Sequence, residues 1–232
     1  MVGAALDEML GEAAERLGVA HYVPFLDERA GAQDAADAWS LIGRGWVLER
    51  TGQLKEAAAS LTRAADMPGA ASVAPVLAAY CRLMESGETG NWDAARASWD
   101  REALWGEFGP LADALAALAD GGPDGAEAPL GLYLRQYPRS PRAQMLLGVC
   151  RERTGAPPAE ALAAYQRAVE LDVGYMPAAR AAGRIIARTQ PRLLDRYLTR
   201  WAEAAGIEAD RLDALKLYCE QHLKTADPAE SQ

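Results

Sequence analysis

The stretch AWSLIGRGWVLERTGQLKEAAASLTRA, residues 38–64, decides the fold class of this chain. It is rich in alanine and leucine, which are good helix formers, and its apolar residues do not alternate with the period of two that a strand requires. Ala57 is followed four residues later by Leu61, so the two lie on one helical face. A small residue admits a neighbouring helix, and a large residue one turn later fills the space beside it. The stretch therefore predicts packed helices.

The pattern of a small residue followed by a large one recurs along the chain. Successive pairs are separated by 38, 33 and 33 residues, and a further step of 33 residues reaches a pair that has lost its small member. We expect the small residues at helix crossings and the large ones buried beside them. The pairs are Ala57 and Leu61, Ala95 and Trp99, Ala128 and Leu132, Ala161 and Tyr165, and finally Leu194 and Leu198.

The three cysteines follow a related period. Cys81, Cys150 and Cys219 are each separated by 69 residues, about twice a helix–turn–helix unit of roughly 34 residues. An odd number of widely spaced cysteines is not a disulfide framework, and no CxxC pair indicates a metal site. We predict three reduced, unpaired cysteines in equivalent places on helices.

These units resemble the tetratricopeptide-repeat family. Two units carry the resemblance best, and it extends in weaker form over about residues 36 to 205. In the first unit, Gly45 is similar to the family's packing glycine, Gly52 to its turn glycine, and Pro68 to its terminating proline. Ala57 and Ala64 are similar to the small residues of the second helix. The matching residues of the second unit are Leu147, Gly148, Gly155, Ala161, Tyr165, Ala168, Leu171 and Asp172.

The resemblance implies an all-α fold, a right-handed α-α superhelical solenoid of about five helix–turn–helix repeats. We expect this solenoid over residues 36–224, with a capping helix at its C-terminal end. Residues 1–35 are expected to form N-terminal capping helices, and residues 225–232 a disordered tail.

The composition excludes several classes of protein. The formal net charge is −9, which argues against a nucleic-acid binder. No run of apolar residues is long enough for a transmembrane helix, so we expect no membrane association. The first 16 residues carry four acids and lack the basic start of a secretory signal, so we expect a cytoplasmic protein.

Residues with catalytic potential form no recognisable constellation. His21 and His222 have no metal-ligand neighbour at helical spacing, and the phosphate-binding, HExxH and GxSxG motifs are absent. We therefore expect no enzyme, no cofactor and no metal, and a scaffold or adaptor that binds a protein or peptide. Two alternatives stay open: a homo-oligomerising structural solenoid, and an enzyme or small-ligand sensor that uses a tryptophan-lined pocket.

The concave groove of such a solenoid is lined by the first helix of each unit, so the resemblance implies candidate partner-binding residues. Trp39 and Trp46 are candidate aromatic anchors, with the alternative that the N-terminal helices cover them. The full candidate set is Trp39, Ile42, Trp46, Arg50, Tyr80, Arg142, Met145, Arg180, Arg184 and Arg188.

Arginines form two ridges in the C-terminal part of the chain. Arg180, Arg184 and Arg188 are spaced by four residues, and Arg192, Arg196 and Arg200 continue the series on the next helix. Because arginine suits carboxylates, the first ridge predicts a partner with an acidic segment. The alternative is a solvated face with salt bridges to nearby acids such as Asp195 and Glu203.

Overall fold

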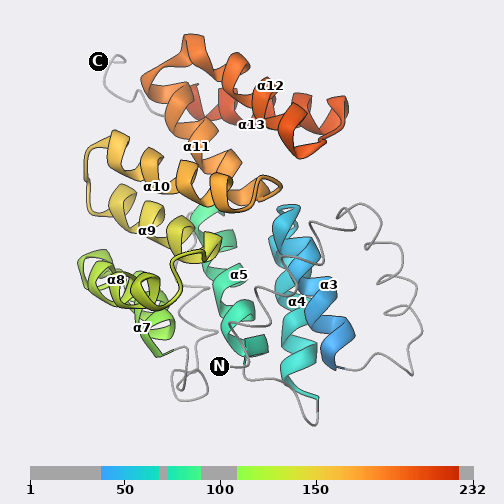
Figure 1. Cartoon of the computed structure of the whole chain (residues 1–232), viewed down its shortest axis with the longest axis vertical. Helices are drawn as coiled ribbons and strands as arrows, with labels where there is room; N and C mark the ends of the chain where they lie inside the picture. Colours follow the sequence, from blue (N-terminus) through green and yellow to red (C-terminus); the bar gives the residue numbers. More distant parts are fainter. Residues whose placement is uncertain (1–37, 68–72, 90–108, 225–232) are drawn as a thin grey trace. The chain divides into compact units, whose positions relative to one another are not determined.

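The computed structural model describes residues 38–67, 73–89 and 109–224, and within these ranges every regular element is a helix (Figure 1). The predicted all-α class is confirmed at that level. No helix in these ranges is both long and apolar enough to cross a membrane. The expectations for residues 1–35, for Ala95 and Trp99 and for the tail 225–232 lie outside the described residues. The chain divides into two compact units, with the boundary between Pro138 and Arg139.

The N-terminal unit packs each helix against the next one described along the chain. Helix α3 packs on α4, α4 on α5, and α7 on α8. The turn around Gly121–Gly125, expected from its glycines, contains a short 3-10 helix, η2. The elements are α3 (Ala38–Arg50), α4 (Leu54–Ala65), α5 (Val73–Thr89), α7 (Gly109–Ala119), η2 (Pro123–Gly125) and α8 (Glu127–Gln136).

The C-terminal unit is also built from consecutive helices in contact, with α9 on α10, α10 on α11, and α11 on both α12 and α13. Ser140 caps α9 by accepting a hydrogen bond from the backbone N–H of Ala143 at 3.3 Å. Pro158 occupies the first position of α10, where its missing N–H costs no helical hydrogen bond. The elements are α9 (Pro141–Arg153), α10 (Pro158–Leu171), α11 (Met176–Thr189), η3 (Pro191–Leu193), α12 (Leu194–Ala205) and α13 (Ala209–Lys224).

Three helix pairs share one close contact, in which a glycine of the first helix meets a large residue of the second. Gly45 on α3 lies against Leu61 on α4, and Gly148 on α9 lies against the ring of Tyr165 on α10. A Cβ on Gly183 of α11 would lie 3.2 Å from Leu198 Cδ2 and 2.8 Å from a cysteine sulfur of α13. In each pair a larger residue would force the helices or the side chain to shift.

The buried faces of the second helices confirm most of the predicted register and correct part of it. Ala57, Leu61, Ala161 and Tyr165 are all fully buried, and Leu194 and Leu198 are buried as well. The prediction for Ala128 and Leu132 is wrong, because both are exposed. The inward stripe of α8 instead consists of Ala126, Leu130 and Tyr133. Leu132 lies two residues, about 200°, from the inward Leu130 and so faces away from the core.

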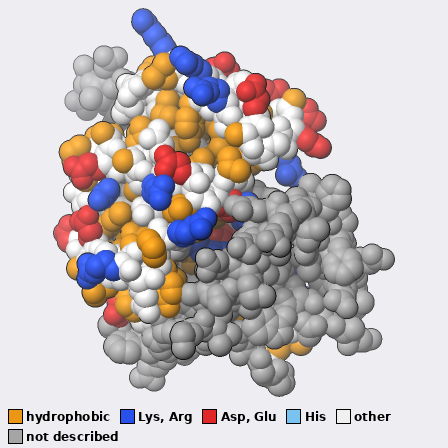
Figure 2. Space-filling view, viewed as in Figure 1, with side chains coloured by type: hydrophobic (Ala, Val, Ile, Leu, Met, Phe, Trp, Pro, Cys, Tyr) orange, Lys and Arg blue, Asp and Glu red, His pale blue; other side chains and the backbone are white. Residues whose placement is uncertain are grey.

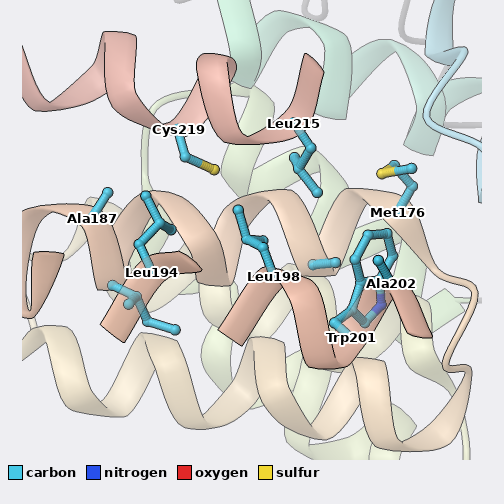
Figure 3. Packing of buried hydrophobic residues seen from close by; sticks show 10 residues of the cluster. Met176, Ala187, Leu194, Leu198, Trp201, Ala202, Leu215 and Cys219 are labelled. Carbon is cyan, nitrogen blue, oxygen red and sulfur yellow. The ribbon is translucent and has the colours of Figure 1, made fainter. Parts of the chain in front are cut away.

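The cysteine prediction is confirmed. Cys81 on α5, Cys150 on α9 and Cys219 on α13 are buried on helices and form no disulfide. Cys219 belongs to the core between α11, α12 and α13, where Leu198 and Trp201 of α12 meet Leu215 of α13 (Figure 3). The indole N–H of Trp201 donates a hydrogen bond to the carbonyl oxygen of Val173 at 2.8 Å, which satisfies the polar group of this buried ring.

Candidate functional site

Six arginines occur at intervals of four residues from position 180 to position 200. The structure divides this series at the turn between α11 and α12. The first three, Arg180, Arg184 and Arg188, lie on α11, and the last three, Arg192, Arg196 and Arg200, lie on η3 and α12. The two groups have different surroundings, and only the first is engaged by other helices of the C-terminal unit.

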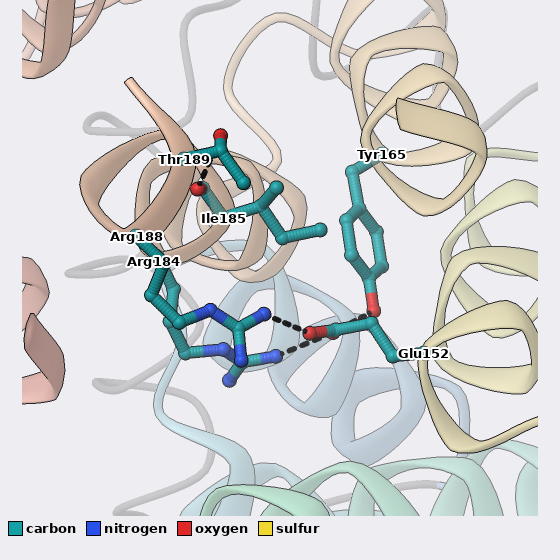
Figure 4. A network of polar contacts seen from close by, with 6 residues as sticks. All are labelled: Glu152, Tyr165, Arg184, Ile185, Arg188 and Thr189. Atoms are coloured by element: carbon teal, nitrogen blue, oxygen red, sulfur yellow. Dashed lines mark hydrogen bonds and ion pairs between the residues drawn. The ribbon is translucent and has the colours of Figure 1, made fainter. Parts of the chain in front are cut away.

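A single carboxylate holds two of the α11 arginines. Arg184 Nη2 lies 2.7 Å from Glu152 Oε2, and Arg188 Nη2 lies 2.8 Å from Glu152 Oε1 (Figure 4). The hydroxyl of Tyr165 donates a third hydrogen bond to Glu152 Oε2 at 2.6 Å. Both carboxylate oxygens therefore accept charge-assisted or short hydrogen bonds, which are the stronger kind in proteins.

Three helices supply this network, and their packing explains how the side chains meet. Glu152 lies on α9 one turn after Gly148, the glycine that Tyr165 of α10 contacts. Because the ring of Tyr165 lies close against α9 at Gly148, its hydroxyl reaches the next turn of that helix. Arg184 and Arg188 are one turn apart on α11, so both guanidinium groups point from one face of that helix.

The protonation states of the network follow from burial and charge. Burial alone would raise the pKa of Glu152, but Arg184, the Tyr165 hydroxyl and Arg188 together outweigh burial and lower it. Burial and the neighbouring carboxylate raise the pKa of Tyr165 well above its ordinary value. Burial opposes the charge of Arg184, yet Glu152 outweighs this and raises the Arg184 pKa. At neutral pH the carboxylate is ionised, the phenol is a donor, and both arginines are charged.

The third arginine of α11 has a different neighbour. The guanidinium carbon of Arg180 lies 5.0 Å from the centre of the Tyr218 ring on α13, a distance typical of a cation–π contact. The thiol of Cys219, also on α13, has its pKa raised to about 11 by burial, although Arg184 and Arg180 act in the opposite direction. All three α11 arginines thus contact other parts of their own unit.

Most of the other candidate partner-binding residues are buried. Trp46 is 6% exposed and its ring lies 5.0 Å from the guanidinium carbon of Arg50, while the side chain of Trp39 lies outside the described residues. Side chains with so little exposure pack against their neighbours and present little surface to a partner. Partner binding by these residues therefore stays a prediction. The buried candidates are Ile42, Trp46, Arg50, Tyr80, Arg142 and Met145.

Sequence reasoning did not connect Glu152, the residue at the centre of the site, with the arginines of α11. Glu152 is separated from Arg184 by 32 residues, so no local pattern connects them. Tyr165 was expected to pack in the core, which it does, but its hydroxyl has a polar role as well. One local signal was available, because Glu152 lies one turn after a packing glycine. A tyrosine that packs against that glycine needs an acceptor for its hydroxyl, and Glu152 is in the right place to be that acceptor.

The second group of arginines forms no ion pair with any residue that the structure describes. Arg192, Arg196 and Arg200 are exposed. The nearby acid Asp195 pairs with Lys216 of α13, with Lys216 Nζ 2.6 Å from Asp195 Oδ1. The structure thus pairs Asp195 with a lysine of α13, and not with these arginines as the alternative interpretation had it.

Comparisons with protein-family models, with curated proteins and with solved structures find no match to this chain. The tetratricopeptide-repeat assignment thus continues to rest on the residues quoted above. Within the described ranges, no group of three or more histidine, cysteine or acidic side chains is placed to hold a metal ion.

Proposed function

We propose that this chain is a non-catalytic scaffold or adaptor that binds a segment of another protein. Its architecture would be a solenoid of about five tetratricopeptide-like helix pairs with capping helices. The shared glycine contact of three helix pairs supports this architecture, because each unit then repeats the same close crossing. The three buried cysteines, which form no disulfide, are compatible with the expected cytoplasmic location, where thiols stay reduced.

The observation that carries the proposal is the bridge from Arg184 through Glu152 to Arg188. Two guanidinium groups share one carboxylate, so the cluster keeps one positive charge in excess. The Arg188 side chain is 38% exposed, and only one of its nitrogens is used by Glu152, so further N–H groups can donate to a partner carboxylate. Because Glu152 already holds the guanidinium in place, binding would cost little side-chain entropy.

The proposal is tested with a fluorescently labelled acidic peptide that carries apolar residues, and with a matched peptide in which glutamine replaces each acid. Fluorescence anisotropy should detect binding of the acidic peptide to the full chain, strongest at low salt. Arg188→Gln should weaken this binding mainly through slower association. Arg184 is unsuitable for this test, since its loss would leave Glu152 poorly paired and disturb the fold.

The matched control is Arg167→Gln. Arg167 is an exposed arginine of α10 that forms a surface pair with Glu170 at 2.9 Å. If the acidic and glutamine peptides bind equally, or if Arg188→Gln and Arg167→Gln have the same effect, the α11 arginines are not the binding site. Circular dichroism of each variant establishes that the helices are intact.

A further inference from the structure

The exposed arginines that follow α11 form a ridge, defined as Arg192, Arg196 and Arg200. Arg192 lies in η3 and the other two lie on α12, at successive intervals of four residues. Among the residues that the structure describes, none accepts a hydrogen bond from these guanidinium groups or forms an ion pair with them. This distinguishes the ridge from the arginines of α11, which contact Glu152 and Tyr218.

The stability of α12 does not account for the ridge. Like charges four residues apart on a helix repel each other. Arg196 also lies in the first turn of α12, where the helix dipole disfavours a positive charge. Asp195 in the same turn suits the dipole, but its carboxylate is bound by Lys216 of α13. Arg196 therefore does not stabilise the start of α12, and the exposed guanidinium groups of the ridge remain accessible to an external anion.

We propose that the ridge is a docking surface for an acidic helix of a partner protein. The inference rests on the proposed function in so far as both require a protein partner. On α12 four residues rise about 6 Å, so two carboxylates four residues apart on a partner helix would match Arg196 and Arg200. A third carboxylate, four residues further along the partner helix, would reach toward Arg192 of η3. The planar guanidinium fork can bind each carboxylate through two hydrogen bonds.

A shallow hollow lies at the beginning of the ridge and gives the surface an apolar component. It is lined by residues 189–193, which include Arg192 and Leu193. Leu193 is 47% exposed, so a large apolar side chain faces water beside Arg192. An apolar side chain of the partner helix, one turn before or after its first carboxylate, would remove Leu193 from water and fix the register of the two helices.

The charges around the ridge favour a short acidic helix over a long polyanion. Glu203 on α12 and Glu208 after it are both exposed, close in sequence to the last arginine. Figure 2 shows basic side chains at the top of this unit and acidic side chains toward its upper right. A partner helix with three carboxylates ends before it meets these acids.

The test uses a labelled synthetic helix with glutamates at three successive positions four residues apart and a leucine beyond one end. Its control has glutamines in place of the glutamates. In fluorescence anisotropy the full chain should bind the acidic helix, and Arg196→Gln should weaken binding about five- to tenfold at low salt. Arg167→Gln, the exposed arginine of α10, should leave binding unchanged. Arg196→Glu combined with a lysine at the central peptide position should restore binding.

Each other outcome overturns the inference. Equal losses in Arg196→Gln and Arg167→Gln would mean general charge attraction. Tighter binding of a single-stranded oligonucleotide or of anionic lipid vesicles would mean a different occupant. If binding is lost in Arg188→Gln but kept in Arg196→Gln, the ridge is not the docking surface, while the proposed function of the α11 arginines is supported. If the full chain binds neither the acidic helix nor the other acidic peptide, both the docking ridge and the proposed function are wrong.

Discussion

The ring of Tyr165 lies against Gly148, so closely that a Cβ at Gly148 would overlap it. This contact connects the packing of α9 and α10 with the polar network, because the hydroxyl of the same tyrosine donates to Glu152 one turn further along α9. The position of the carboxylate, and through it the positions of Arg184 and Arg188, thus depends on a glycine that takes no part in any polar contact of the site.

Gly148→Ala should destabilise the protein by about 1–3 kcal/mol, the usual cost of overpacking a core. The fully buried ring of Tyr165 has little room to move away from the new methyl group. Urea denaturation followed by circular dichroism measures the change. Gly131→Ala on α8 is the control: the nearest atom to its Cβ would be an Arg135 nitrogen at 3.9 Å, so it should stabilise the helix by about 0.5–1 kcal/mol. Equal effects of the two substitutions would contradict the close contact at Gly148.

Tyr165→Phe should keep the packing and remove one donor from the carboxylate. A hydrogen bond to a charged group contributes about 1.5–3 kcal/mol, and the Glu152 side chain is 19% exposed, so water can compensate in part. We expect a loss of about 1–2 kcal/mol in the free energy of unfolding, measured by denaturant titration. In a double-mutant cycle with Glu152→Gln the two effects should be non-additive. Additive effects would show that the hydroxyl and the carboxylate act independently.

The decrease in the free energy of unfolding at acidic pH should depend on Glu152. Its pKa is lower in the folded protein than the ordinary value of 4.5, so its contribution to stability is complete above that pH. The contribution is lost as the pH falls below 4.5 and through the folded pKa, because protonation weakens the bonds to both arginines. The difference in unfolding free energy between the native chain and Glu152→Gln should therefore shrink as acid is added.

The control for this pH series is Glu170→Gln, which removes an exposed carboxylate whose pair with Arg167 contributes about 0–1 kcal/mol. This variant should follow the native chain at every pH. A constant difference between the native chain and Glu152→Gln down to strongly acidic pH would contradict the lowered pKa.

The three cysteines should not react with a thiol reagent in the native protein. All are buried, and burial raises the pKa of Cys219 to about 11, so its thiolate is scarce at neutral pH. A colour-forming disulfide reagent should report almost no thiol in buffer and all three in denaturant. Rapid reaction of any cysteine in buffer would mean that its helix opens readily or that it is accessible.

Much of the helical architecture could be read from local patterns. The step from Ala57 to Leu61 and the positions of Gly45 and Gly148 concern residues within one helix or one helix pair. Within such a short stretch, period and spacing determine which side chains share a face. The prediction for Ala128 and Leu132 was wrong because an alanine-rich segment offers several such pairs. Only the packed faces distinguish them.

The sequence does not distinguish the two groups of arginines from each other. Their spacing of four residues predicts two equivalent ridges, since the local pattern is the same in both. Only the tertiary structure decided that Arg184 and Arg188 bind Glu152 while Arg196 and Arg200 remain exposed. The physical reason is that an ion pair needs a partner within a few ångströms, and for α11 that partner comes from α9, a helix that folding brings into reach from far along the chain.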